Sequence, residues 1–270
     1  MLDAMYAAGL APAKDIDLRD DGRLTRYRVQ GDKPGSRNGW AVQHSHPIGA
    51  GAFGSWKTGE SHTWRDAATQ PQTQAQRVEL QHQLAAMQQA RASEQTAVQA
   101  AARDRAATLW ARAHPATGGH PYLTRKRVPA YAVRQLRDML VLPARDCDGV
   151  LHTLQFISAD GSKRFLTGGR IAGCYYAIGT PFAALLLAEG YATGATLHQA
   201  TGEAVAVCFN CGNLLAVARA LRDKYPRLRL IVCADDDQAT PGNPGITHAR
   251  AAAEAVGGFL AVPAFVGSAP

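Results

Sequence analysis

A regular alternation of strand and helix patterns after residue 181 constrains the fold of this chain more than any other feature of its sequence. Four short apolar runs, each typical of a buried strand, are separated by three segments rich in helix-forming residues. Near-continuous apolar strands joined by helical crossovers form parallel sheets with helices on both faces. The sequence therefore predicts an α/β fold, with a Rossmann-like parallel sheet over residues 181–266. The predicted strands are residues 184–190, 203–209, 228–237 and 259–265.

The N-terminal part of the chain has a different composition and predicts two further segments. Residues 1–68 combine frequent glycine with alternating polar and apolar positions, which predicts a small β-rich unit with tight turns. Residues 69–114 are expected to form a helical connector. The stretch 72–114 contains no glycine or proline and is rich in alanine, glutamine and arginine, which favours one long helix or two consecutive helices.

Residues 115–180 are expected to form a small basic subdomain of mixed α+β structure that precedes the α/β domain. Two Asp-Gly pairs, at 148–149 and 160–161, lie between alternating runs and predict hairpin turns. Basic side chains in this segment are candidates for binding nucleotide or nucleic acid, because phosphate neutralisation supplies most sequence-independent affinity. A solvated basic surface is the alternative interpretation. The candidates are Arg125, Lys126, Arg127, Lys163, Arg164 and Arg170.

Carboxylates follow two of the predicted strands in the α/β domain. Glu189 follows the run LLLA, and Asp235, Asp236 and Asp237 follow LIVCA. Ligands of such sheets gather beyond the carboxyl ends of the strands, where converging carboxylates repel each other unless a cation is present. Oxygen ligands of this kind suit Mg²⁺, and Asp235 and Asp237 can face one site together on extended backbone. Helix caps and solvated loops are the alternative roles for acidic residues after strands.

The segments LLLAEGYATGATLHQATG and IVCADDD resemble the two halves of a Toprim domain. The form Glu189-Gly190-Tyr191 is especially similar to a motif of the bacterial replicative primases. The longer pattern, which includes HPYLTRKRV and FNCGNLLAVARALRDKYP, resembles primases of plasmids, phages and conjugative elements. This resemblance covers about residues 105–265 and continues more weakly over residues 20–66.

The resemblance implies a Mg²⁺-dependent DNA primase, a nucleotidyltransferase that joins nucleotides on a single-stranded DNA template. Glu189 matches the acidic residue of the family, which serves as general base or metal ligand. Asp235 and Asp237 match the metal-binding pair, for Mg²⁺ or Mn²⁺. The implied partners are single-stranded DNA, nucleoside triphosphates and a replicative or element-encoded helicase.

The cysteines and aromatic residues bear on how far this resemblance extends. Replicative primases usually carry an N-terminal zinc module, whereas this chain has only the pair Cys208 and Cys211, which we interpret as buried or half-buried thiols. The aromatic side chains of the N-terminal unit are expected mainly to fill its core, and stacking on bases is the alternative. These aromatic residues are Trp40, Phe53, Trp56 and Trp64.

Charge and cysteine usage narrow the setting in which this chain works. The formal net charge is +7 and the sequence pI is about 9.3, which is compatible with a polyanionic partner. Five cysteines within mostly apolar runs indicate reduced thiols and a cytoplasmic protein. The most apolar stretch, residues 181–188, is too short to span a membrane.

Two other functions are compatible with the same residues. A Toprim nuclease would use the same carboxylates to cleave phosphodiesters. A non-catalytic single-stranded-DNA-binding protein would retain the fold alone. A topoisomerase is disfavoured because it needs a nucleophilic tyrosine on another domain and a large gate.

Overall fold

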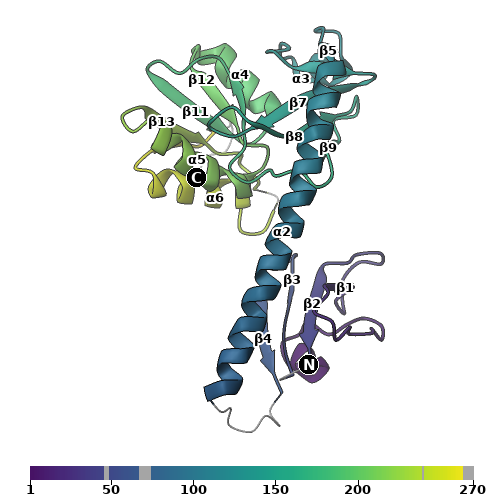
Figure 1. The fold of residues 1–270 in the computed structure, drawn as a ribbon. Helices are drawn as coiled ribbons and strands as arrows, with labels where there is room; N and C mark the ends of the chain where they lie inside the picture. Colours follow the sequence, from purple (N-terminus) through teal and green to yellow (C-terminus); the bar gives the residue numbers. More distant parts are fainter. Residues whose placement is uncertain (46–48, 67–73, 239, 264–270) are drawn as a thin grey trace. The chain divides into compact units, whose positions relative to one another are not determined.

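The computed structural model describes residues 1–45, 49–66, 74–238 and 240–263. The chain divides into two compact units, Met1–Arg91 and Ala92–Pro270, each with its own hydrophobic core. A single helix, α2 (Gln74–Arg112), passes from the first unit into the second (Figure 1). Residues 67–73, which span the expected boundary between the N-terminal unit and the connector, and residues 264–266, at the expected end of the α/β domain, lie outside the described residues.

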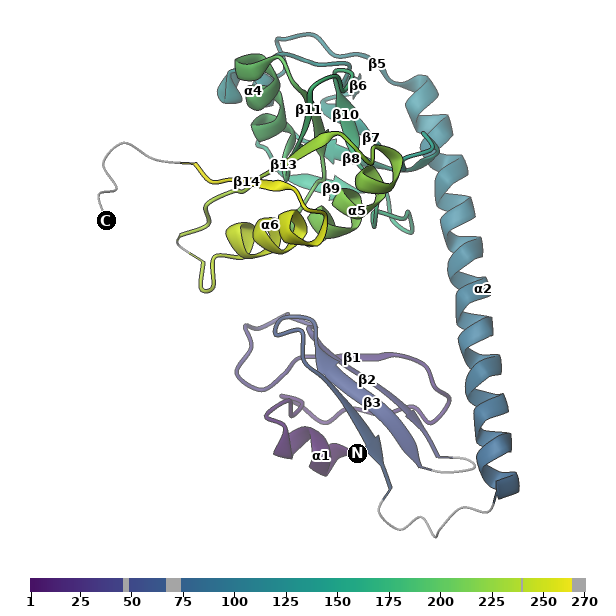
Figure 2. The same ribbon diagram turned by 90° about the vertical axis from the view of Figure 1, so that its left-hand side faces the viewer.

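The N-terminal unit is a four-stranded antiparallel sheet in the order β1-β2-β3-β4. Its elements are α1 (Leu2–Ala7), β1 (Thr25–Tyr27), β2 (Gly39–His44), β3 (Ala50–Ser55) and β4 (Ser61–Arg65). Figure 2 shows α1 lying along one side of this sheet. On that side, Met5 and Leu10 pack against Tyr27, Ala41 and Phe53, and together these side chains form the core of the unit.

The second unit begins with an antiparallel sheet in the order β5-β6-β7-β8-β9. Its elements are β5 (His114–Pro115), α3 (Pro121–Lys126), β6 (Arg134–Leu136), β7 (Met139–Arg145), β8 (Leu151–Ile157) and β9 (Lys163–Phe165). Ala106, near the end of α2, and Ala113, directly after it, pack against Val141, Leu154 and Phe156. This contact fixes the end of the long helix on one face of the sheet.

The α/β part of the second unit is a five-stranded sheet in the order β10-β12-β11-β13-β14. Strands β11 to β14 are parallel where they pair, as the sequence predicts, and β10 is an antiparallel edge strand. The elements are β10 (Tyr176–Ile178), β11 (Ala184–Ala188), α4 (Tyr191–Thr201), β12 (Ala204–Val207), η1 (Cys211–Asn213), α5 (Leu214–Lys224), β13 (Arg229–Cys233), α6 (Pro244–Ala255) and β14 (Phe259–Ala261). Strand β10 lies within residues 115–180, the segment that the sequence assigns to the basic subdomain, but it pairs with β12 and so belongs to the α/β sheet.

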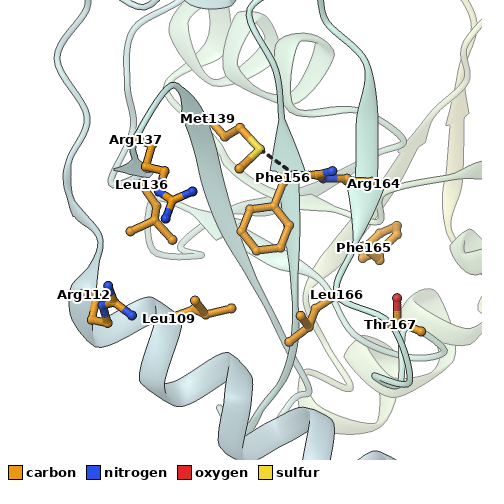
Figure 3. A pocket seen from close by; sticks show the side chains of 10 residues that line it. All are labelled: Leu109, Arg112, Leu136, Arg137, Met139, Phe156, Arg164, Phe165, Leu166 and Thr167. Carbon is orange, nitrogen blue, oxygen red and sulfur yellow. Dashed lines mark hydrogen bonds between the residues drawn. The ribbon is translucent and has the colours of Figure 1, made fainter.

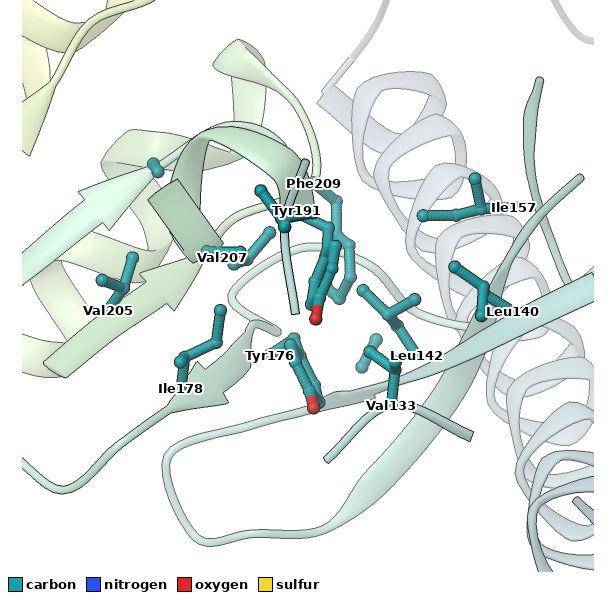
Figure 4. Packing of buried hydrophobic residues seen from close by; sticks show 14 of the residues in the cluster. Val133, Leu140, Leu142, Ile157, Tyr176, Ile178, Tyr191, Val205, Val207 and Phe209 are labelled. Carbon is teal, nitrogen blue, oxygen red and sulfur yellow. The ribbon is translucent and has the colours of Figure 1, made fainter. Parts of the chain in front are cut away.

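Both faces of the α/β sheet are covered, and this explains why its strands are apolar throughout. Helices α5 and α6 pack on one face, against residues such as Leu187 and Val232 (Figure 1). The other face receives α4 and also the neighbouring antiparallel sheet, so that Leu140, Ile157 and Tyr191 belong to one buried cluster (Figure 4). The two sheets of the second unit therefore share a single core.

Hydrogen bonds from two tyrosines reinforce this shared core. The Tyr191 hydroxyl donates to the carbonyl oxygen of Pro129 at 2.7 Å and accepts from the backbone N–H of Tyr131 at 2.9 Å. The Tyr176 hydroxyl donates to the carbonyl oxygen of Tyr131. Because both tyrosines are buried, these bonds satisfy hydroxyl groups that would otherwise be costly to bury. They tie the segment after α3 to the α/β sheet.

Among the described residues, no helix has both the length and the apolar character that crossing a membrane requires.

Candidate active site

The carboxylates after β11 and β13 lie at the point where the direction of the strand crossovers reverses. The chain passes from β11 to β12 on one side, and then crosses β11 to reach β13 on the other side. Strands β11 and β13 are parallel neighbours, with Leu187 paired to Val232. Glu189 directly follows β11 and Asp235 lies just beyond β13, so both reach the same edge of the sheet. This switch point is where open α/β sheets bind their ligands.

Electrostatic interactions show that the three predicted carboxylates are brought together. The pKa of Glu189 is raised to about 7, first by burial and then by the negative charges of Asp235 and Asp237. Burial likewise raises the pKa of Asp235, and the charge of Asp237 adds to this effect. The Thr193 hydroxyl, which donates to Asp235 Oδ1 at 3.4 Å, and the Lys163 ammonium act in the opposite direction. The cluster is thus an acidic site whose negative charge is only partly compensated.

One oxygen of Glu189 has no hydrogen-bond partner. Its Oε1 is buried and unpaired within the described residues, while the backbone N–H of Cys211 stabilises the ionised carboxylate. An unpaired buried carboxylate oxygen is costly, so such groups commonly serve a ligand. Oε1 is therefore the atom of this site that most clearly lacks a partner.

The loop after β13 uses its three aspartates differently. The carboxylate of Asp236 accepts from Asn243 Nδ2 at 2.6 Å and so holds the loop in place. Asn243, the N-cap of α6, also accepts from the backbone N–H of Asp237 at 3.1 Å. Gly245 lets α6 approach closely, because a Cβ at this position would overlap the backbone oxygen of Asp235. These contacts leave the carboxylates of Asp235 and Asp237 available to the site.

Lys163 is the predicted basic residue that the structure brings to the carboxylates. It begins β9, and its Nζ lies 3.3 Å from where a Cβ on Gly190 would stand. Desolvation lowers the pKa of Lys163, the nearby Lys126 lowers it further, and Asp235 and Glu189 oppose this shift. The ammonium of Lys163 therefore faces the acidic edge, with Lys126 close by.

Arg125 lies in α3 and Arg127 directly follows this helix, and Arg125 contacts the turn before Lys163. The Arg125 guanidinium donates from Nη1 to the carbonyl oxygen of Ala159 at 2.9 Å, on the turn that precedes Lys163. Arg127 is exposed and ends α3 in a left-handed conformation, with φ of 54°. Arg125 thus supports the turn that presents Lys163.

Arg164 and Arg170 are not brought to the acidic edge. Successive residues of a strand point to opposite faces, so Arg164 points away from the side occupied by Lys163. It lies over a separate pocket, where its Nη2 is 3.2 Å from Met139 Sδ and its guanidinium is 5.9 Å from the Phe156 ring (Figure 3). Arg170 forms an ion pair with Asp146, at 3.0 Å between Nη2 and Oδ2.

Several further residues shape the site, and their signals in the sequence differ. Asn243-Pro244 is an N-cap followed by proline at the first helical position, a signal that was available in the sequence. Thr193 and Cys211 have no comparable local signal, because they reach the carboxylates only through the fold. The thiols of Cys208 and Cys211 are free, the first buried and the second half-buried, as expected.

The donor set of this edge fits a divalent cation that is shared with a ligand. Among the described residues, no three metal-ligating side chains are close enough to hold an ion by themselves. Mg²⁺, however, is usually held by one or two carboxylates, with phosphate and water oxygens completing its shell. The neighbouring charges of Asp235 and Asp237, which are only partly compensated, match that requirement. The residues are therefore compatible with Mg²⁺ whose shell is completed by oxygens of a ligand or of water.

Comparison with known proteins places this site within a recognised domain. Residues 184–265 match the family model of the Toprim domain. Two Escherichia coli proteins, each named DNA primase TraC, are 37% identical to the chain. Their alignments extend over 257 and 278 residues and cover 91% and 97% of this chain. The chain spans only 24% and 19% of the length of these relatives.

Two solved structures show limited similarity to the chain. The primase fragment of the bacteriophage T7 primase-helicase protein has a TM-score of 0.42 and 11% sequence identity, over 57% of this chain and 66% of that chain. A DNA primase domain from Pseudomonas aeruginosa has a TM-score of 0.33 and 19% identity, over 46% of this chain and 40% of that chain.

Proposed function

We propose that this chain, which contains a Toprim domain and is related in sequence to DNA primases named TraC, is a DNA primase that joins nucleotides on single-stranded DNA. The observation that carries this proposal is the cluster of Glu189, Asp235 and Asp237 at the switch point of the sheet, opposite the Lys163 ammonium. Such a site offers carboxylates for a cation and a positive charge for phosphate, as nucleotidyl transfer requires.

Each residue has a distinct role in this proposal. Asp235 and Asp237 would hold Mg²⁺, which, when bound, neutralises phosphate charge and orients the triphosphate. Glu189 would accept the proton of the attacking hydroxyl, because a pKa of about 7 suits a base that works near neutral pH. Lys163 would bind a phosphate oxygen, and Lys126 would add positive charge beside it. Arg125 would keep Lys163 in position by holding the preceding turn.

A primer-synthesis assay tests the proposal directly. The full chain is incubated with single-stranded DNA, Mg²⁺ and labelled ribonucleotides, and product lengths are resolved on a gel. Glu189→Gln keeps the size of the side chain but removes the base, so we expect synthesis to fall by about 100-fold or more. DNA binding should stay within a few-fold. Glu254→Gln, an exposed residue of α6, is the matched control.

Three outcomes of this assay would contradict the proposal. Unchanged primer yield in Glu189→Gln would remove Glu189 from the chemistry. Shortening of the DNA, without extension, would identify a nuclease that uses the same carboxylates. DNA binding with no activity in the wild type, under Mg²⁺ or Mn²⁺, would leave a binding protein that retains the fold.

The biological setting completes the proposal. The substrates would be nucleoside triphosphates and a single-stranded template, and a replicative or element-encoded helicase would supply that template. We further propose a cytoplasmic protein of a mobile genetic element, such as a plasmid, a phage or a conjugative element. The sequence relationship to the TraC primases supports this setting.

A further inference from the structure

The N-terminal sheet has a second face that its own core does not use. Tyr27, Ala41 and Phe53 point toward α1 and are buried. Because side chains alternate along a strand, Arg26 and Trp40 point to the opposite, outer face, where register pairs them across β1 and β2. None of the four strands described here contains an acidic residue. The outer face is therefore both basic and aromatic.

Two tryptophans form a platform on this outer face. Trp40 lies over Gly54, since a Cβ on Gly54 would stand 2.8 Å from Trp40 Cζ2. The rings of Trp40 and Trp56 have centroids 5.9 Å apart, and Trp56 remains 49% exposed. The Arg26 guanidinium lies 4.4 Å from the Trp56 ring centroid. Large aromatic rings kept at the surface, instead of in the core, indicate contact with a ligand.

Basic groups continue from this platform into a pocket at the edge of β1. The pocket has a volume of about 470 Å³, and no acidic residue lines it. Its four basic lining residues are Lys14, Arg26, Arg28 and Arg37. Asp32, an acidic residue near the platform, is already paired with Lys57 at 2.7 Å. The pocket and the platform share Arg26, so positive charge and aromatic surface are continuous.

We propose that this outer face binds single-stranded nucleic acid, through residues other than the carboxylate cluster of the second unit. Bases would stack on Trp56 and Trp40, and phosphates would contact Arg26, Arg28 and Arg37. This combination of ring and basic groove binds single strands without sequence preference, because every base has a stacking face. The inference rests on the proposed function only for the choice of DNA as the ligand. An acidic peptide could match the charge but would not use the exposed rings for base stacking.

Binding of a fluorescent oligothymidylate to the full chain tests this inference, in the absence of nucleotides and metal. We expect Trp56→Leu to weaken binding roughly tenfold, because one stacked base contributes about 1–3 kcal/mol. Trp56→Phe, which keeps an aromatic ring at this position, should retain most of the wild-type affinity for the oligonucleotide. Arg26→Ala combined with Arg28→Ala should lower the salt slope of binding by about 1.4, at about 0.7 for each lost contact. Arg103→Ala combined with Arg112→Ala, two exposed residues of α2, is the charge-matched control.

A covalent readout supplies an independent test. An oligonucleotide carrying 5-iodouracil should cross-link to Trp56 in the wild type and in Glu189→Gln alike, so loss of synthesis and loss of this site are distinguishable. Circular dichroism establishes that the variants are folded. Unchanged affinity and salt slope in the tryptophan and arginine variants would overturn the inference. So would equal binding of duplex DNA, or an acidic peptide that displaces the oligonucleotide at equal charge concentration.

Discussion

Replacing Glu189 by glutamine should make the metal-free protein more stable at alkaline pH, even though it removes the proposed base. The pKa of Glu189 is raised from 4.5 to about 7 in the folded protein, mainly by burial. The folded state thus holds a proton that the unfolded state releases. The stability that this proton contributes is complete below about pH 4.5, and it is lost as the pH rises through about 7.

The size of the effect follows from the same shift. A rise from 4.5 to about 7 corresponds to roughly 3 kcal/mol at most, at 1.36 kcal/mol for each pH unit. Glu189 is only partly buried, so solvent screening reduces the expected value to about 1–2 kcal/mol. Glutamine has a similar shape and carries no charge, and it should not show this loss. The variant should therefore be about 1–2 kcal/mol more stable than the wild type at pH 8, and close to it at pH 5.

Urea unfolding with a chelator present, at pH 5 and pH 8, measures this difference. Added Mg²⁺ should raise the wild-type unfolding midpoint at pH 8 and leave Glu189→Gln less affected, because a cation favours the ionised carboxylate. Parallel pH dependence in the two proteins would refute the reasoning. It would mean that burial and the neighbouring carboxylates do not raise the pKa of Glu189 in the folded protein.

Three further substitutions test the site and the packing of the second unit. Lys163→Met should raise the KM for nucleoside triphosphate at least several-fold in steady-state primer synthesis. Arg164→Met, which changes the neighbouring residue on the opposite face of β9, should change this KM less than twofold. Equal effects of the two substitutions would contradict the assignment of the two faces. Gly245→Ala should lower the unfolding free energy by about 1–3 kcal/mol, because the added Cβ would overlap the backbone of Asp235. Gly118→Ala is the control: Gly118 has open space around it, so its substitution should leave the unfolding free energy unchanged in the same urea titration. Asn213→Ala should lower the free energy of unfolding by about 2–4 kcal/mol, because the buried side-chain amide of Asn213 forms hydrogen bonds with the backbone of Gly173, Cys174 and Cys208. A decrease below about 1 kcal/mol in urea unfolding would show that water replaces these hydrogen bonds.

The α/β sheet could be predicted because its information is local. Each of the strands β11 to β14 is a short apolar run, and each crossover helix has its own composition and end signals. The carboxylates follow directly, since parallel strands bring their carboxyl ends to one edge. The antiparallel edge strand β10 has no such signal, because three residues, Tyr176 to Ile178, are too few to show a period.

The basic residues show where sequence reasoning stops. Lys163 and Arg164 are neighbours in the chain, and the sequence makes both of them candidates for binding phosphate, but they occupy opposite faces of β9. Arg170 was an equally plausible phosphate ligand, and its ion pair with Asp146 depends on a contact 24 residues away in sequence. The aromatic residues of the N-terminal unit divide in the same way: Phe53 is buried, whereas Trp56 is half exposed. Charge and ring type alone do not determine which face a side chain occupies.

The common core of the two sheets in the second unit also limits how this protein can evolve. Leu140 and Ile157 of the antiparallel sheet and Tyr191 of α4, in the α/β half, are buried in one cluster that both halves form. A gene rearrangement that joined either half to a foreign partner would leave these side chains in water, at a cost of several kcal/mol. The halves should therefore be inherited together, and recombination should succeed more readily at junctions outside residues 113–261.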